Sequence, residues 1–269
     1  MEGNKESKIA LLIDADNAQS DQIKNILAEA GKHGKVTIRR IYGNWTDNRL
    51  SAWKTKINTF SIRPVQKFSI AQGKNSTDTA MIIDAMDILH SKNVSGFCIA
   101  SSDSDYSGLA QRIREEGIFV MGVGEAKKTS DAFIYACDLF VFTENLDSIV
   151  EKEITEKPST KKKTVTKKTV EKEIETTKEK TNLPINKITN KPIDTDFLIK
   201  AYEMAEDDSG LAYMGEIGIA LRKLDPGFDS RTYGSATMVG LIKKLPELFE
   251  LIYKDKGSSL YLKLKKQSM

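Results

Sequence analysis

The chain has 269 residues, of which 39% are hydrophobic and 29% are charged, with a formal net charge of +3. This length suits one domain of ordinary size and a second small module. No apolar run approaches the roughly 20 residues of a membrane-spanning helix. The N-terminus also lacks a separate apolar region that ends in a signal-peptide cleavage site. These absences predict a soluble protein.

Short apolar, strand-like runs alternate with helical patterns between residue 8 and about residue 148. The expected strands are KIALLID, VTIRRIYG, FSIRPVQKF, FCIASSD, IFVMGVG and LFVF. The expected helices run from about Ser20 to His33, through LSAWKTKIN, STDTAMIIDAMDILHSK and YSGLAQRIREEG, and in a short segment through Tyr135. This alternation predicts an α/β domain, residues 1–148, with a mostly parallel sheet and helices on both faces.

The composition changes abruptly in residues 149–192. Residues 151–192 contain 12 Lys and 7 Glu, a net of +5, and subtracting +5 from +3 leaves about −2 for the rest of the chain. The segment has no apolar stripe wide enough for a core, which predicts a flexible linker. Because the excess positive charge is confined to it, the net charge does not argue for nucleic-acid binding by the folded parts.

Apolar periodicity returns in residues 193–269. DTDFLIKAYEMA, MGEIGIALRKL and TMVGLIKKLPE suit three helices, and FELIYKD and SSLYLKL flank a Lys-Gly turn that indicates a hairpin. Three helices and a terminal hairpin predict a winged-helix-like module. Cys98 and Cys137 lie in apolar surroundings without CxxC spacing, which favours buried thiols in a reducing cytoplasm.

Three acidic groups follow strands or begin a helix of the first domain. Asp14 comes directly after IALLI, Asp103 and Asp105 follow FCIA, and Asp78 lies near the start of the third helix. The carboxyl ends of parallel strands meet at one crevice, so we expect Asp14 and Asp103 to approach each other there. A single Asp after a strand is often only a helix cap or turn residue; the three groups together favour a common site.

The phase of the third helix places Asp78 with its apolar face. Asp78 shares that face with Met81 and Ala85, whereas Asp84 and Asp87 fall elsewhere and are expected in solvent, Asp84 near the rim. Converging carboxylates repel one another, and a hard divalent cation relieves the repulsion. Oxygen-only ligation favours Mg²⁺ or Mn²⁺ over Zn²⁺. Such ions activate water for attack on a phosphodiester, so hydrolysis is the expected chemistry.

These motifs resemble the NYN family of PIN-like nucleases, on LLIDADN, GKNSTDTAMIIDAMD, ASSDSDYSGLAQRIREEGIFVMGVG and SDAFIYACDLFVFTENL. The resemblance implies a PIN-like three-layer α/β/α fold and Mg²⁺- or Mn²⁺-dependent RNA cleavage. Its metal-binding and catalytic acids would be Asp14, Asp78, Asp103 and Asp105. The candidate supporting residues are Asp16, Asn17, Lys74 and Ser102. Two departures, Ser-Ser before Asp103 and Tyr106 where Phe is common, remove no carboxylate.

The C-terminal residues 214–251 resemble the LOTUS (OST-HTH) domain, most specifically in FDSRTYG. That family is associated with RNA binding and, in some members, with docking on a protein partner, and the sequence does not choose between them. Lys243, Lys244 and Lys254 are either phosphate contacts or part of a solvated face. Tyr42, Trp45 and Trp53 follow the second strand, where they either stack on bases or pack in the ordinary way.

The sequence thus predicts an endoribonuclease domain whose linker lets the LOTUS domain raise the local concentration of RNA. The alternative is a non-catalytic RNA-binding adaptor that uses the domain as a scaffold. A phosphatase of the haloacid-dehalogenase type also has DxD after its first strand. It requires Thr or Val where this chain has Ala18, and SSDSDY is too compact for its later motif.

Overall fold

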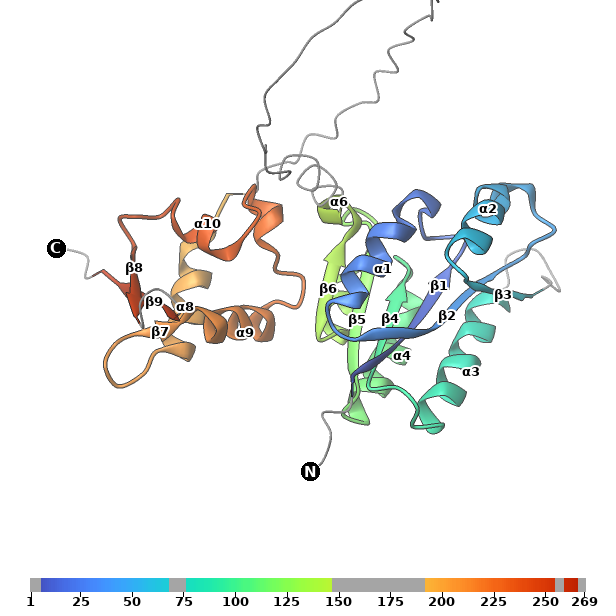
Figure 1. The fold of residues 1–269 in the computed structure, drawn as a ribbon, viewed down its shortest axis with the longest axis horizontal. Coiled ribbons are helices and arrows are strands. Elements are labelled where there is room, and N and C mark those ends of the chain that lie inside the picture. Colours follow the sequence, from blue (N-terminus) through green and yellow to red (C-terminus); the bar gives the residue numbers. More distant parts are fainter. Residues whose placement is uncertain (1–5, 68–75, 147–191, 255–258, 266–269) are drawn as a thin grey trace, which may run out of the picture.

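The computed structural model describes residues 6–67, 76–146, 192–254 and 259–265. The linker expected at 149–192 therefore lies almost entirely outside the described residues. Within them, two modules are present, coloured blue to yellow-green and orange to red in Figure 1. No helix in these ranges has the length and apolar character needed to cross a bilayer.

The first module contains a six-stranded parallel sheet in the order β3-β2-β1-β4-β5-β6. The strands are β1 (Lys8–Asp14), β2 (Lys35–Gly43), β3 (Arg63–Gln66), β4 (Gly96–Ala100), β5 (Phe119–Gly124) and β6 (Leu139–Phe142). The helices are α1 (Ile23–Gly31), α2 (Ser51–Thr59), α3 (Ser76–His90), α4 (Ser107–Glu115), α5 (Asp131–Ala136) and α6 (Thr143–Leu146). The predicted alternation of strands and helices is confirmed.

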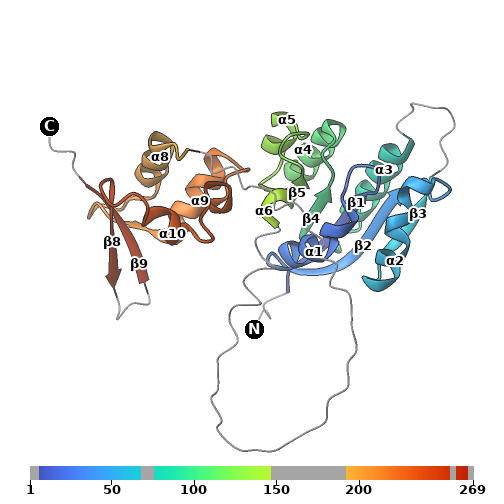
Figure 2. The same ribbon diagram turned by 90° about the horizontal axis from the view of Figure 1, so that it is seen from above.

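Helices cover both faces of this sheet, as Figure 2 shows. Alternate residues of β1 point to opposite faces because side chains alternate along a strand. Leu12 belongs to the core formed with α3, α4 and α5, whereas Leu11 and Ile13 belong to the core formed with α1 and α2. All five residues of β4 are buried. Burial on both faces explains why the central strands are almost wholly apolar.

Among its described residues, the second module has three α-helices, the short 3-10 helix η5 (Ser230–Tyr233) and a small antiparallel sheet in the order β7-β9-β8. Its elements are α8 (Thr195–Ala205), β7 (Ala212–Tyr213), α9 (Met214–Leu224), α10 (Met238–Ile242), β8 (Phe249–Lys254) and β9 (Ser259–Leu264). A separate core contains Leu198, Ile217, Leu221 and Phe249. The winged-helix-like arrangement predicted from three helices and a terminal hairpin is confirmed.

Candidate metal centre

The carboxyl ends of β1 and β4 bring the first two acidic motifs together. These strands are parallel neighbours, with Ile13 opposite Ala100. The next residue of each strand path, Asp14 and Ser101, therefore meet at the sheet edge, where the Ser101 hydroxyl donates to Asp14 Oδ2 at 2.9 Å. The expected approach of the two motifs at one edge of the sheet follows from this register.

Three of the four expected acids form one cluster. Asp78, Asp103 and Asp105 each offer a carboxylate oxygen, and these oxygens all lie within 4.8 Å of one another. Asp103 begins the short 3-10 helix η3 (Ser104–Tyr106), and its Oδ1 accepts from the backbone N–H of Asp105 at 3.0 Å. Asp78 and Asp103 are half-buried and Asp105 is exposed, so the cluster opens to solvent.

Asp14 is not part of this group of three. It is only 1% exposed and is held by hydrogen bonds from the Asn17 amide at 2.7 Å, from Ser101, and from the backbone N–H of Asp16 at 3.1 Å. Burial raises the pKa of Asp14, the nearby Asp78 raises it further, and the bonds from Asn17 and Ser101 partly offset the rise. These hydrogen bonds fix the orientation of the Asp14 side chain, which lies near Asp78 of the cluster.

Two of the candidate supporting residues, Asn17 and Ser102, make different contacts. Asn17 does hold Asp14, whereas Ser102 does not contact a carboxylate: its hydroxyl accepts from the backbone N–H of Glu125 at 2.8 Å. This bond ties the turn after β4 to the end of β5. Gly124 permits the approach, since a Cβ there would lie 2.7 Å from the Ser101 carbonyl oxygen. Ser102 therefore shapes the turn, and the neighbouring Ser101 bonds the carboxylate.

Asp16 and Lys74 complete the expected supporting residues. The Asp16 side chain is exposed and its backbone N–H donates to Asp14. The pKa of Asp16 is raised, chiefly by partial burial and also by Asp47 and Asp78, against a lowering by Arg49. Lys74 lies outside the described residues.

Tyr106 is a site residue that the sequence did not single out for a role. Its side chain is fully buried, and its hydroxyl donates to Asp78 Oδ1 at 2.7 Å. Burial raises the pKa of Tyr106, and Asp14 and Asp78 raise it further, so the hydroxyl stays protonated and remains a donor. The signals in the sequence were its place directly after the second acid of SSDSDY and the hydroxyl that distinguishes it from the Phe common in the family.

Two of the three aromatic residues in and after β2, Tyr42 and Trp53, are buried inside the fold. Tyr42 is fully buried and its hydroxyl donates to Asp84, which also pairs with Arg40. For Tyr42 this burial favours ordinary packing over stacking on bases, and Asp84, which was expected in solvent, is instead paired and only partly exposed. Trp53 is 2% exposed and its indole N–H donates to the Ala15 carbonyl.

Trp45 and the two lysines of the C-terminal module have different surroundings. Trp45 is half-buried, and its indole N–H donates to the Val65 carbonyl at 3.1 Å. Lys243 is exposed. The Lys244 ammonium donates to the carbonyls of Tyr233 and Gly234 at 3.1 and 2.9 Å. These bonds hold the turn at residues 233 and 234 against α10.

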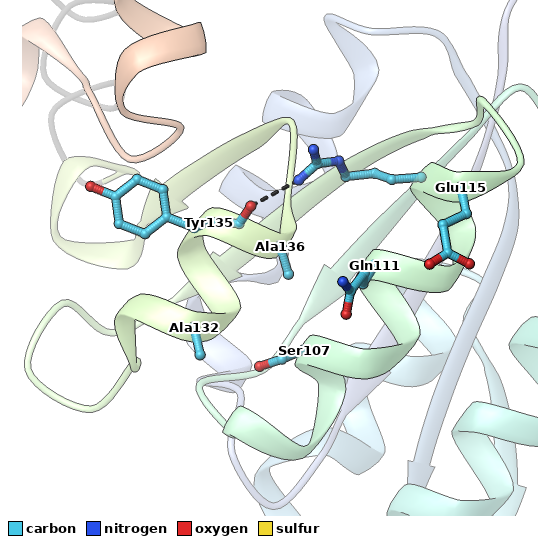
Figure 3. Close-up of a pocket in the computed structure, with 7 residues that line it drawn as sticks. Ser107, Gln111, Glu115, Ala132, Tyr135 and Ala136 are labelled. Carbon is cyan, nitrogen blue, oxygen red and sulfur yellow. Dashed lines mark hydrogen bonds between the residues drawn. The ribbon is translucent and has the colours of Figure 1, made fainter.

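A hollow lies between α4 and α5 (Figure 3). Ser107, which directly follows η3, lines one end, and Tyr135, which is 56% exposed, lies at the other. Arg114 bridges the two helices by donating to the Tyr135 carbonyl at 2.8 Å. None of the four expected acids lines the hollow, so the carboxylates form a separate feature at the strand ends.

The donor set suits a hard cation. Three carboxylates supply oxygen ligands only, and their converging negative charges repel one another. Asp14 adds a fourth carboxylate behind them. Cys98 and Cys137, the soft ligands, are free and buried in the cores, where burial raises the pKa of both thiols.

A profile of the NYN domain matches residues 8–147, just over half of the chain and the whole of the α/β module. The chain belongs to the NYN-domain family. A profile of the OST-HTH/LOTUS domain matches residues 190–261. The acidic cluster thus lies in the NYN domain, which is a PIN-like nuclease domain, and the LOTUS domain, a type associated with RNA binding, follows it.

Other comparisons add little to this assignment. No curated protein matches the chain. A protein of unknown function from Vibrio parahaemolyticus is 22% identical over 53% of this chain and 96% of its own, with a TM-score of 0.45. An uncharacterized protein from Nitrosomonas europaea is 28% identical over 37% of this chain and 96% of its own, with a TM-score of 0.28.

Proposed function

We propose that this protein is a Mg²⁺- or Mn²⁺-dependent endoribonuclease whose LOTUS domain binds RNA or a protein partner that brings RNA. The observation that carries the proposal is the convergence of Asp78, Asp103 and Asp105 at the strand ends of an NYN domain. The reaction is hydrolysis of a phosphodiester bond. Buried free thiols suit a reducing compartment, and we place the activity in the cytoplasm.

The three clustered carboxylates would hold the ion, with Asp14 as a further ligand or as the support that orients them. When bound, the divalent cation supplies water activation and charge stabilisation for in-line attack on phosphorus. The protein's own contribution is to hold the carboxylates in position. Ser101 holds Asp14 at its carboxylate and also accepts from the Asp103 backbone N–H at 3.1 Å, so one hydroxyl links both strand ends.

The test is cleavage of labelled single-stranded and structured RNA with Mn²⁺, Mg²⁺ or EDTA, by the full chain and its Asp103→Asn variant. Asparagine keeps the Oδ1 acceptor that caps η3, so the variant should fold while losing a ligand charge. Asp87→Asn, an exposed carboxylate on α3, is the matched control. We expect metal-dependent cutting by the wild type and the control, and a loss of about 100-fold in the Asp103 variant, since even partners that only orient a metal ligand are typically worth about 10- to 100-fold.

Two other results would change the assignment. If neither protein cuts RNA but both bind it, the chain is an RNA-binding adaptor that uses the NYN domain as a scaffold. If the wild type and Asp103→Asn cut equally in the presence of EDTA, the acidic cluster is not the catalytic centre.

A further inference from the structure

The LOTUS domain lies against the outermost strand of the NYN sheet. β6 is the last strand in the sheet order, so its outward-facing backbone groups have no strand partner. The Phe140 N–H on this edge donates to the Pro226 carbonyl of the LOTUS domain at 2.8 Å. Unpaired edges of apolar strands are sites of unwanted pairing between chains. The LOTUS domain thus covers an edge that LFVF would otherwise present to solvent.

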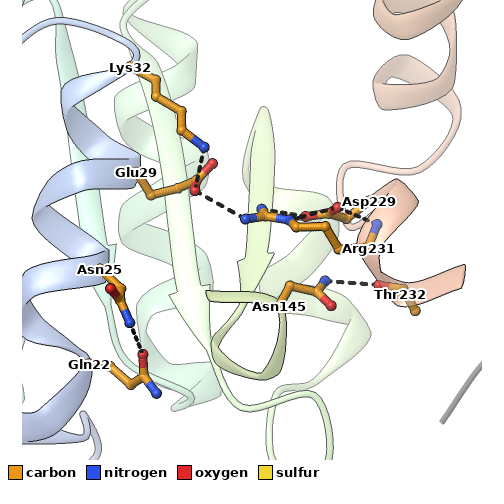
Figure 4. Close-up of polar contacts among 8 residues, drawn as sticks. All are labelled: Gln22, Asn25, Glu29, Lys32, Asn145, Asp229, Arg231 and Thr232. Carbon is orange, nitrogen blue, oxygen red and sulfur yellow. Dashed lines mark hydrogen bonds and ion pairs between the residues drawn. The ribbon is translucent and has the colours of Figure 1, made fainter. Parts of the chain in front are cut away.

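An ion-pair network crosses the boundary next to this bond (Figure 4). Arg231 of the LOTUS domain lies 3.3 Å from Glu29 on α1, and it also binds Asp229 in its own loop. Lys32 contacts the same Glu29 oxygen at 2.7 Å. The Arg231 and Glu29 side chains are only 14% and 7% exposed. The positive charges of Arg231 and Lys32 thus neutralise the negative charges of Glu29 and Asp229.

Two further contacts flank the network. Asn145 on α6 donates to the Thr232 hydroxyl at 2.9 Å. Gly227 packs so closely on the sheet edge that a Cβ there would lie 3.3 Å from Ile134 and 3.4 Å from Phe142. The loop from Pro226 to Thr232 therefore contacts α1, α5, β6 and α6 at once, and these elements fix one orientation.

We propose that the loop of residues 225–233 latches the LOTUS domain onto the β6 edge, making the two domains one unit that presents RNA to the acidic cluster from a fixed side. Docking within one chain benefits from effective concentrations of about millimolar, so a contact of modest affinity holds the domains together. This differs from the freely ranging recruitment domain that the sequence suggested.

The second half of this proposal rests on the proposed nuclease function. β6 lies two strands from β4, which carries Asp103 at its end, and neighbouring strands are about 4.8 Å apart. The β6 edge therefore lies about 10 Å from β4 across the sheet, and the latched domain begins beyond that edge. RNA bound by a fixed LOTUS domain would reach the cluster at a constant distance from its point of attachment.

The test releases the latch from the NYN side. The double variant Glu29→Ala with Asn145→Ala removes two cross-domain partners and leaves the Arg231–Asp229 pair intact. Arg231→Ala attacks the same contact from the other side. The matched control, Gln111→Ala with Glu115→Ala, changes exposed residues on α4. The readouts, on the full chain, are hydrogen–deuterium exchange, small-angle scattering and the positions of RNA cleavage.

We expect amide exchange across Leu139–Phe142 to quicken by about tenfold or more in both latch variants, because Phe140 loses its acceptor. The radius of gyration should increase, and the cleavage positions should spread. The control should match the wild type. Unchanged amide exchange and an unchanged radius of gyration in both latch variants would overturn the latch.

Unchanged cleavage positions in a variant whose two domains are shown to have separated would overturn the presentation of RNA from a fixed side. Failure of the wild type to cut RNA would overturn the nuclease, while exchange and scattering would still decide the latch.

Discussion

At the scale of single residues, the acidic cluster depends on a neutral donor. The Tyr106 hydroxyl bonds Asp78, the one carboxylate of the cluster that comes from α3 rather than from the turn after β4. Without this hydrogen bond, the Asp78 side chain could adopt another rotamer and would then no longer lie beside Asp103. A buried tyrosine with a raised pKa cannot add a negative charge to the cluster.

Tyr106→Phe should therefore weaken the site without unfolding the domain. Removal of one hydrogen bond to a ligand typically lowers metal affinity by about 10-fold or more, and we expect that for Mn²⁺ measured by electron paramagnetic resonance or calorimetry. The stability of the metal-free domain should fall by only about 1 kcal/mol, since Asp78 is half-buried and water can replace the donor. Unaltered Mn²⁺ affinity would show that the hydroxyl does not position Asp78.

The residues that the sequence identified at this site are those with a local signature. Asp14 and Asp103 follow apolar strands, and Asp78 has the phase of the buried face of α3, so strand ends and helical periodicity were sufficient. Ser101 and Ser102 have the same local surroundings, and only the register of β4 against β1 and β5 decides which one bonds a carboxylate. The role of Tyr106 likewise depends on where α3 lies in space.

At the scale of elements, α3 is attached to β2 by a polar contact inside a largely apolar interface. Asp84 pairs with Arg40 and accepts from the Tyr42 hydroxyl, which holds the helix that carries Asp78. Burial and the Asp84 bond raise the pKa of Tyr42. Periodicity placed Asp84 outside the apolar stripe and thus in solvent. It could not show that Arg40 and Tyr42, more than 40 residues earlier, would meet it.

Asp84→Ala should destabilise the NYN domain by about 2 kcal/mol, because it leaves the buried Tyr42 hydroxyl and the Arg40 guanidinium without their acceptor. Urea unfolding followed by tryptophan fluorescence measures this domain alone, since both tryptophans, Trp45 and Trp53, belong to it. Asp87→Ala on the exposed side of the same helix is the control and should leave the midpoint unchanged. Equal midpoints for the two variants would contradict a stabilising role for the Asp84 contact.

At the scale of the whole molecule, sequence patterns defined each domain and its fold but not the contact between them. The contacting surfaces are made of residues with no common period: Glu29 on an α-helix, Phe140 on a strand, and Arg231 in a short 3-10 helix within residues 225–233. FDSRTYG stood out as the most specific LOTUS segment, and both its arginine and its threonine contact the NYN domain. Family resemblance found the segment, and only the tertiary structure shows what it contacts.

The pKa of His33, in the NYN domain, depends on a residue of the LOTUS domain. The His33 ring packs against Phe119 in a tilted arrangement, with ring centroids 5.1 Å apart. Burial lowers its pKa, Glu29 opposes this, and Arg222 of the LOTUS domain and Lys32 lower it further. Because the folded pKa lies below the unfolded value of about 6.5, protonation favours the unfolded state. The stability that neutral His33 contributes is therefore present above about pH 6.5 and is lost as the pH falls through the folded pKa.

His33→Gln should remove this pH dependence. The free energy of unfolding of the wild type minus that of the variant should be larger at pH 7.5 than at pH 5, and NMR titration should give His33 a pKa below its ordinary value. His90, which bonds the Met86 carbonyl at the end of α3, is the only other histidine, and its replacement assigns the two signals. Arg222→Ala should then raise the His33 pKa in the full chain, because the arginine of the LOTUS domain no longer opposes protonation. An unchanged His33 pKa in that variant would mean that Arg222 does not stay near α1 in solution, and the latch would have to be open.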